Sequence, residues 1–400
     1  MNYQSPNFVT KAALARRSAI YLFLEEICVD LDLTKAQNDK AKSAYESVAD
    51  WMSKSTNPFL ASVDVYPQGS VALGTAVRPL GSDEFDVDLI NLIHRCHPYM
   101  LPEEAKKLVG DRLAEHQFYA KILEEKKRCW RLNYAGDFHL DISPTIQNPK
   151  CKAEGELVPD RKLHSWHPTN PKGYRKLFAS RALLTPKIRG GVLNIDKRAL
   201  ASVEPFPDPS LTKGVLRRTV QLLKRHRDNH FLHVKEEIAP ISVIITTLAM
   251  QAYAYCVRNH SFDDELEILV ETIRMMPHFI EKFWANNQQN YAVWNETTEG
   301  ENFADRWNME PKRITAFFSW HAKALSDFEA IRDAVGLDTV IKSTRDQLGG
   351  RVVDRVVSKR HEGVAAARTT KSLYVAPAVG IITSARASAT PVPRNDFFGD

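Results

Sequence analysis

The first part of the chain carries a helical pattern of apolar positions. Residues 11–54 contain no proline or glycine, so nothing there interrupts a helix. Apolar side chains recur at the i, i+4 and i+7 spacing that lines one helix face, and they include Ala44, Val48 and Trp51. We therefore expect two helices, or one long bent helix, before the first strand.

Strand-like segments begin after residue 60. Residues 62–68 and 84–93 are short and rich in β-branched or aromatic side chains, which is typical of strands. The segment VALGTAV between them predicts a short helix, and residues 102–125 predict a longer one. CWRLNYAG and FHLDISPTI predict a hairpin or two neighbouring strands. This alternation of strands and helices indicates a mixed α/β core.

Helical periodicity dominates the second half of the chain. Residues 148–209 are rich in proline, and only 173–184 among them predict a helix. Later segments have helical spacing and predict a second, all-helical lobe; they are residues 212–229, 238–257, 263–284 and 311–335. The uncharged segment 238–257 contains a proline and several polar side chains. We therefore expect a buried core helix there and not a membrane span.

These patterns predict three parts in the chain. Residues 1–210 are expected to form the α/β core together with the N-terminal helix, and residues 211–360 the helical lobe. Residues 361–400 are rich in alanine, threonine, serine and proline. Because such a segment has too few large apolar side chains to fold alone, we expect a flexible C-terminal tail.

Composition and charge narrow the class of protein. An apolar fraction of 44% and a charged fraction of 26% are ordinary for a soluble globular protein. The net charge of +5 suits a small anionic ligand but is too weak to indicate a genome-binding protein. The five cysteines are dispersed, with no CxxC pair. This favours reduced thiols in a cytoplasmic protein over a disulfide framework or a structural zinc site.

Three aspartates alternate with apolar residues in two of the predicted strands. Neighbouring residues on a strand face opposite ways, so Asp86 and Asp88 in FDVDL face away from the apolar side chains around them. Asp141 in HLDI does the same. The apolar residues can then be buried while the carboxylates face a cleft. The alternative is a solvated strand with alternating acids.

Carboxylates so close together repel one another unless cations lie between them. Mg²⁺ suits this position because it prefers hard oxygen ligands and completes its shell with phosphate oxygens and water. We therefore expect a site with two Mg²⁺ ions for nucleotidyl transfer, with pyrophosphate as the leaving group. Asp86 and Asp88 hold both ions in this interpretation, and Asp141 binds the ion nearer the attacking hydroxyl.

A glycine and a serine precede the aspartates at a position suited to phosphate binding. Gly69 lets the backbone approach a phosphate closely, and Ser70 adds a hydroxyl donor just before the predicted short helix. Lys224 lies in a basic helix, on a face beside its buried stripe, from which it can reach a triphosphate. The alternative for this helix is a solvated basic face, since it also carries Arg218, Arg225 and Arg227.

Several segments together resemble a known family. QGSVALGTAVRP, FDVDL and LDISP, with HPTNPKGYRKLF, VQLLKRHRD, ISVIITTLA and ENFADRW, resemble the cGAS/DncV-like nucleotidyltransferases (CD-NTases) of bacterial CBASS anti-phage systems. The resemblance implies an α+β fold, in which a polymerase-β-like nucleotidyltransferase core joins the helical lobe with the active site between them. It implies that Asp86, Asp88 and Asp141 are the catalytic metal ligands. It also implies that Gln68, Gly69, Ser70 and Lys224 bind nucleotide.

The same resemblance implies a reaction and partners. The enzyme would join NTPs, such as ATP, GTP or both, into a cyclic di- or trinucleotide that activates an effector protein. Animal cGAS binds DNA through a zinc-bearing insertion, but no His/Cys cluster with ligand spacing occurs in this sequence, so no DNA requirement is expected. The last four residues, FFGD, resemble tails that are conjugated by a partner related to ubiquitin-transfer enzymes. The alternative is an unstructured end without a role.

Two other functions remain open at this point. A linear nucleotidyltransferase, such as a terminal nucleotide-adding or antibiotic-modifying enzyme, shares the same core. A nucleotide-binding sensor without catalysis is the other alternative, although the three carboxylates argue against it because a sensor does not need both metal positions.

Overall fold

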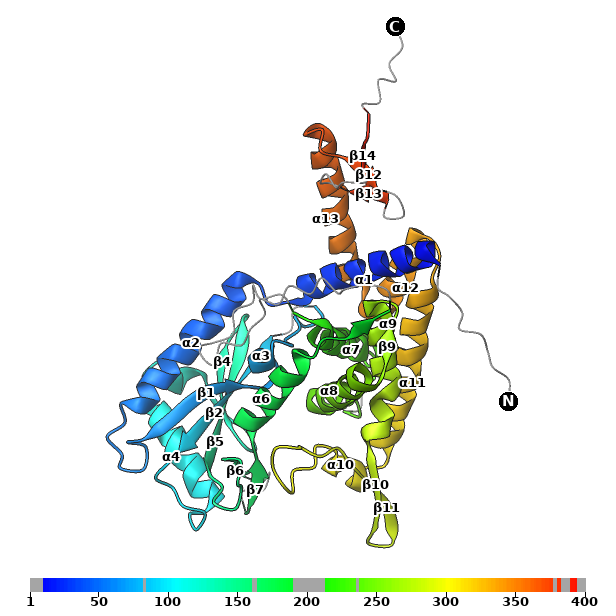
Figure 1. The fold of residues 1–400 in the computed structure, drawn as a ribbon. Coiled ribbons are helices and arrows are strands. Elements are labelled where there is room, and N and C mark those ends of the chain that lie inside the picture. Colours follow the sequence, from blue (N-terminus) through cyan, green and yellow to red (C-terminus); the bar gives the residue numbers. More distant parts are fainter. Residues whose placement is uncertain are drawn as a thin grey trace.

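The computed structural model of the chain describes residues 10–81, 84–159, 164–189, 213–234, 237–376, 380–382 and 389–393. A strand-rich core and a helical lobe lie side by side, and helix α13 projects from the lobe (Figure 1). No helix within these residues is long and apolar enough to cross a membrane. The uncharged segment forms α8 (Ser242–Asn259), which is buried along most of its length as predicted.

The core is built on a mixed sheet. Within the described residues the sheet has seven strands in the order β1-β2-β5-β4-β3, and β6 pairs with both β5 and β7. The pair β2–β5 is parallel, and the neighbouring pairs are antiparallel. The strands are β1 (Val63–Gln68), β2 (Phe85–Ile93), β3 (Leu123–Glu125), β4 (Trp130–Tyr134), β5 (Phe138–Gln147), β6 (Glu156–Pro159) and β7 (Trp166–Thr169).

Two helices cover one face of this sheet. They are α2 (Lys35–Ser53) and α4 (Pro102–Ala114), and their apolar side chains share one core with those of β2 and β5. Trp51 Nε1 donates to the Arg112 carbonyl at 2.8 Å, and Arg112 Nη2 donates to the Trp51 carbonyl at 2.7 Å. These reciprocal hydrogen bonds hold the two helices together on the sheet.

The helical lobe has a second core, to which both halves of the chain contribute. Helices α1 (Lys11–Leu31) and α6 (Pro171–Ala182) pack into it although they precede the lobe in sequence. The other helices are α7 (Val215–His230), α8, α9 (Glu265–Met275), η1 (Met276–Phe279), α10 (Asp305–Met309), α11 (Lys312–Asp333), α12 (Leu337–Leu348) and α13 (Gly350–Thr369). The short parallel pair β8 (Lys187–Ile188) and β9 (Ser261–Phe262) lies beside them.

The predicted α+β fold class is confirmed, and the N-terminal region forms two helices. Helix α1 ends before α2 begins because Thr34 caps the second helix. The Thr34 hydroxyl accepts from the Gln37 backbone N–H at 3.2 Å, and the Gln37 side chain accepts from the Thr34 N–H at 3.0 Å. This reciprocal capping box starts a new helix where the spacing of apolar residues alone allows one long helix.

Two predicted helices are wrong in part. The segment 102–125 contains α4, the short α5 (Tyr119–Ile122) and then β3, because residues 123–125 pair with β4. The segment 263–284 ends its helix at Met275, and residues 281–285 form β10 (Glu281–Ala285), which pairs with β11 (Gln288–Ala292). Asn286 and Asn287 both have positive φ, as a two-residue hairpin turn requires. Within the described residues, the regular structure of the lobe is therefore helical apart from this hairpin and β9.

The predicted tail also differs from the structure. Helix α13 continues past residue 361 to Thr369, since Val352, Val353 and Val356 bury its first half. A small sheet follows, made of β12 (Tyr374–Ala376), β13 (Gly380–Ile382) and β14 (Thr390–Pro391). The FFGD end, residues 397–400, lies outside the described residues.

Candidate active site

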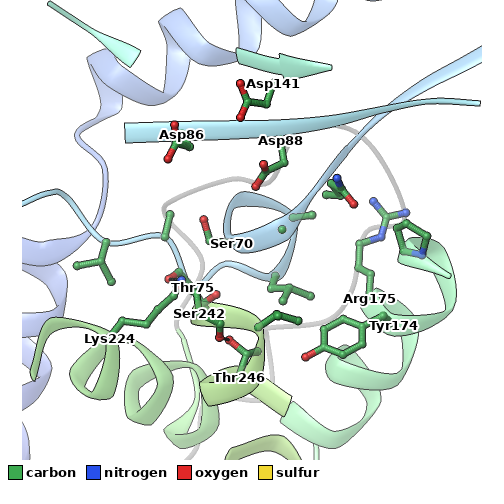
Figure 2. Close-up of a pocket in the computed structure, with 18 of the residues that line it drawn as sticks. Ser70, Thr75, Asp86, Asp88, Asp141, Tyr174, Arg175, Lys224, Ser242 and Thr246 are labelled. Carbon is green, nitrogen blue, oxygen red and sulfur yellow. Dashed lines mark hydrogen bonds between the residues drawn. The ribbon is translucent and has the colours of Figure 1, made fainter. Parts of the chain in front are cut away.

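A cavity of about 520 Å³ lies between the core and the helical lobe. On the core side it is lined by residues of β1, β2, β5 and α3 (Gly69–Leu73), among them Gln68, Gly69, Ser70, Asp86, Asp88 and Asp141, which we call the sheet wall. Lys224, Arg227, Asp228, Ser242 and Thr246 of α7 and α8 line the other side, which we call the helix wall. Figure 2 shows the three carboxylates facing Lys224, Ser242 and Thr246 across the space. Every residue predicted for the site lines this cavity.

Strand register brings the three aspartates together. Asp88 and Asp141 are direct partners in the parallel pair β2–β5, and Asp86 lies beside His139. The apolar neighbours are fully buried on the other face, and they include Val87, Leu89, Leu140 and Ile142. The alternation expected from the sequence is therefore present, and it places all three carboxylates at the cavity, where the Asp86 side chain is 56% exposed and that of Asp141 is 16% exposed.

Gly69 allows the chain to turn directly beside Asp88. Its φ is +65°, in the left-handed region that favours glycine, and a Cβ at this position would collide with the Asp88 carboxylate. Gln68 is also the antiparallel partner of Asp88 in the pair β1–β2. The glycine is thus required twice, once for the backbone conformation and once to leave room for Asp88.

Asp88 is the least compensated of the three carboxylates. Among the described residues it makes no hydrogen bond or ion pair with another side chain. Burial in the cavity wall, followed by repulsion from Asp141 and Asp86, raises its pKa to about 7. The site therefore carries more negative charge than its surroundings balance.

The other two carboxylates share one arginine. Arg131 on β4 donates from Nε to Asp141 Oδ1 at 2.7 Å and from Nη2 to Asp141 Oδ2 at 2.8 Å. The same Nη2 donates to Asp86 Oδ1 at 3.1 Å. His139 contacts Asp86 Oδ1 through Nδ1 at 3.2 Å and Glu84 through Nε2 at 2.6 Å. Arg131 and His139 were not identified from the sequence.

The aspartates suit a divalent cation in their chemistry. They offer hard oxygen ligands. Burial and then repulsion from Asp141 and Asp86 raise the pKa of Asp88, and a cation between the carboxylates would relieve that repulsion. In the described part of the chain, however, no three His, Cys, Asp or Glu side chains already stand in a metal-binding arrangement. Both oxygens of Asp141 accept hydrogen bonds from Arg131 in this structure.

Helix α7 holds the segment that follows the glycine-serine turn. Side chains of α7 donate to successive backbone carbonyls there: Arg217 to Leu73 at 3.0 Å, Lys224 to Thr75 at 3.0 Å, Gln221 to Ala76 at 2.8 Å, and Arg225 to Arg78. These donors lie along one face of α7. Their hydrogen bonds hold in place the segment after the glycine-serine turn, part of which lines the cavity.

Lys224 lies inside the helix wall and not on a solvated face. It is 5% exposed, and Arg218 and Arg225 are 5% and 3% exposed. The alternative of a solvated basic face is therefore wrong for these three residues. Burial, reinforced by repulsion from Arg227, lowers the pKa of the Lys224 ammonium to about 8. An anion bound in the cavity near Lys224 would favour the charged form of this lysine.

Further polar residues of the cavity were missed in the sequence. Tyr174 and Arg175 come from α6, which begins with the helix-start signal Asn170-Pro171. Ser242 and Thr246 come from the first turns of α8. Asn295 donates to Glu301 at 2.7 Å, and burial raises the pKa of Glu301. The cap signal could have located α6, but no spacing rule joins these distant segments to the aspartates.

Comparisons with known proteins show which family the chain resembles. Residues 22–181 match the Second Messenger Oligonucleotide or Dinucleotide Synthetase domain. The chain is 30% identical to a c-di-GMP synthase of Roseivirga ehrenbergii over 374 residues, which cover 92% of this chain and 94% of the relative. It is 29% identical to the cyclic dinucleotide synthase CdnG of Bradyrhizobium diazoefficiens, over 84% of this chain and 81% of the relative.

Solved structures support the same assignment. The Bradyrhizobium diazoefficiens CD-NTase CdnG in complex with GTP matches with a TM-score of 0.66 and 25% identity, covering 86% of this chain and 98% of that one. Escherichia coli CdnC with ATP shares the fold, with a TM-score of 0.57 at 15% identity, over 83% of this chain and 97% of that one. Members of this family generally depend on divalent metal ions. The chain belongs to the CD-NTases, nucleotidyltransferases that build cyclic oligonucleotides from nucleoside triphosphates.

Proposed function

We propose that this enzyme makes a guanine-containing cyclic dinucleotide, with GTP as a substrate. The similarity to a c-di-GMP synthase along 94% of that relative supports this product. The GTP bound in CdnG, the relative matched at TM-score 0.66, supports the substrate. The observation that carries the mechanism is the convergence of three carboxylates from β2 and β5 on a cavity that also contains Lys224.

We propose that Asp86, Asp88 and Asp141 hold two Mg²⁺ ions. These ions would supply Lewis acidity for the acceptor hydroxyl and neutralise charge on the leaving pyrophosphate. The support is the donor chemistry and the raised pKa of Asp88, which burial and then repulsion from Asp141 and Asp86 raise.

The residues of the chain would position the triphosphate. Gly69 and Ser70 line the cavity, and Figure 2 shows the Ser70 side chain near Asp88. The Ser70 hydroxyl and the backbone N–H groups after Gly69 would donate to phosphate oxygens. Gln68 would contribute from the end of β1. Lys224 would approach from the helix wall, where its partner is an uncharged carbonyl, that of Thr75, so its positive charge remains available to an anion.

Two successive transfers would complete the ring. In the first, a ribose hydroxyl of one nucleotide attacks the α-phosphorus of the other, an oxygen–phosphorus bond forms, and the bond to pyrophosphate breaks. The hydroxyl proton leaves through a carboxylate or water at the sheet wall. The linear intermediate then turns in the cavity, and its remaining triphosphate undergoes the same exchange. Each ring formed releases two pyrophosphates.

We further propose the biological setting that the family implies. The cyclic product would activate an effector protein in CBASS defence, in the cytoplasm where nucleoside triphosphates are available. A partner related to ubiquitin-transfer enzymes would act on the FFGD end, which lies outside the described residues.

Product analysis tests the proposed reaction. Purified enzyme is incubated with GTP, with ATP and with both, each with Mg²⁺, and the products are treated with phosphatase and examined by mass spectrometry. The expected result is a phosphatase-resistant dinucleotide that contains guanine. Phosphatase-sensitive oligomers would instead support a linear nucleotidyltransferase, and a cyclic product without guanine would contradict the substrate proposal.

A further inference from the structure

Arg131 is a cation that the proposed reaction does not use, although it lies at the metal-binding carboxylates. It is the antiparallel partner of Asp141 in the pair β4–β5, so the two side chains share one face of the sheet. Its guanidinium makes hydrogen bonds of 2.7 and 2.8 Å to Asp141 and one of 3.1 Å to Asp86. One arginine side chain therefore balances the negative charge of two of the three carboxylates.

The arrangement around Asp141 leaves little room for a second cation. Both of its oxygens already accept from Arg131. The arginine side chain is 19% exposed and that of Asp141 is 16% exposed, so water screens this pair less than it would a surface pair. A divalent ion on the same oxygens would stand within a few ångströms of the guanidinium and repel it.

We propose that Arg131 is the resident counter-cation of the carboxylate site, and that a divalent metal ion must displace it from Asp141 and Asp86 to bind. This inference rests on the proposed metal-dependent function. Arg131 acts through Asp141 and Asp86, so it is a positioning residue that keeps the two carboxylates together until the metal arrives.

Neighbouring groups provide a place for the displaced guanidinium. Arg131 Nη1 lies 3.2 Å from His139 Nδ1, and His139 Nε2 lies 2.6 Å from Glu84 Oε2. Glu84 also lines the cavity. A short shift toward this acid keeps the positive charge of Arg131 near a carboxylate after Asp141 is released.

Displacement links metal binding to nucleotide binding. A free divalent ion must break the Arg131 contacts and gains only carboxylate ligands and water in return. An ion that arrives with a nucleoside triphosphate brings phosphate oxygens as further ligands. The nucleotide-free enzyme therefore binds divalent ions weakly, and the metal–nucleotide complex releases Arg131.

Direct measurement of Mn²⁺ binding tests this proposal. The full-length protein without nucleotide is titrated with Mn²⁺, and free Mn²⁺ is followed by electron paramagnetic resonance. The variants are Arg131→Gln, which removes the charge, and Arg131→Lys, which keeps the charge but loses the planar fork. Lys127→Gln is the matched control, because it removes one exposed positive charge in the turn before the same strand.

The expected outcomes differ among the variants. Arg131→Gln binds Mn²⁺ about tenfold more tightly than the wild type, because a competing cation is gone. Arg131→Lys binds with intermediate affinity, and Lys127→Gln binds within about twofold of the wild type. Without Mn²⁺, Arg131→Gln melts at a lower temperature than the wild type, and Mn²⁺ raises its melting temperature more.

Equal or weaker Mn²⁺ binding by Arg131→Gln would overturn the proposal and leave Arg131 a purely structural role. Should that variant not fold, Arg131→Lys decides in its place, with affinity no higher than the wild type as the overturning result. Failure of the proposed function has a different signature. In that case the wild type binds no Mn²⁺ even with GTP present, whereas failure of the displacement alone leaves wild-type binding intact.

Discussion

The two walls of the cavity differ in how their charged side chains are balanced. On the sheet wall, β2 and β5 bury their apolar side chains and leave three carboxylates facing the cavity with one arginine between them. On the helix wall, α7 buries its own cations, and each finds an acceptor in the protein: Arg218 pairs with Glu25 and Asp32, and Lys224 donates to Thr75. The sheet wall is left with unbalanced negative charge at Asp88, whereas the helix wall is largely balanced within the fold.

This contrast predicts different consequences of substitution. Removing the charge of Asp88 from the sheet wall relieves repulsion without breaking a side-chain pair among the described residues, so we expect catalysis to be lost while stability is kept. Removing a buried donor from the helix wall leaves a carbonyl without its partner, so stability falls too. The largest effects are therefore expected on activity at the sheet wall.

Asp88→Asn tests the sheet wall most strongly. We expect turnover to fall by roughly a thousandfold, because a proposed metal ligand becomes neutral. The melting temperature of the metal-free protein should stay equal or rise by about 1–3 °C, since Asp88 has no partner to lose among the described residues. Steady-state assays and calorimetry measure the two effects. A variant that loses stability in proportion to activity would contradict the contrast.

Gly69→Ala tests the close approach of the turn to Asp88. The new Cβ would collide with that carboxylate, so we expect activity to fall by about a hundredfold as the metal site is displaced. Gly81→Ala is the matched control, because Gly81 also has positive φ but nothing lies within 4 Å of its added Cβ. Both variants carry a backbone strain of roughly 1 kcal/mol. Similar activities in the two would show that the collision does not matter.

The pH dependence of stability tests the charge excess at Asp88. Its pKa of about 7 exceeds the ordinary aspartate value, so the folded protein binds this proton more tightly than the unfolded chain does. The resulting stability is present below the unfolded pKa and is lost as pH rises through 7.

We therefore expect the metal-free wild type to lose on the order of 2 kcal/mol relative to Asp88→Asn between about pH 4 and pH 7. Urea unfolding of both proteins across this range measures the difference. If the free energy of unfolding changes with pH in the same way for both proteins, the charge of Asp88 is already balanced in the metal-free enzyme.

Lys224→Met and Arg225→Met compare two buried cations of α7. Lys224 lines the cavity and Arg225 does not, although both donate to carbonyls of the same segment. We expect Lys224→Met to raise the KM for GTP about tenfold. Arg225→Met should lower stability by about 1–2 kcal/mol while KM changes little. An unchanged KM in Lys224→Met would remove the phosphate role from this lysine.

The sheet wall could be predicted from the sequence because strand alternation is a strict rule. FDVDL and HLDI each carry their acids at alternate positions, which is enough to place Asp86, Asp88 and Asp141 on the faces opposite their apolar neighbours. The same alternation rule could also have identified Arg131 from the sequence. A hairpin that turns at Gly136 puts Arg131 opposite Asp141, but the sequence analysis did not extend the register that far.

The helix wall could not be predicted to the same extent. A basic amphipathic pattern shows which face of α7 carries charge, but it does not show that Arg218 and Arg225 are buried. Their acceptors are Glu25, Asp32 and the carbonyl of Arg78, which precede α7 by more than a hundred residues. The hairpin β10–β11 was missed for a related reason, since pairing between strands outweighed the helical spacing of residues 281–284.

One measurement tests the central claim that the three carboxylates build a cyclic guanine dinucleotide. The wild type and the double variant Asp86→Asn/Asp88→Asn are incubated side by side with GTP and Mg²⁺, and their phosphatase-treated products are analysed by mass spectrometry. The account predicts a phosphatase-resistant cyclic dinucleotide from the wild type and none from the double variant, with both proteins folded by circular dichroism. The same cyclic product from both proteins would contradict it.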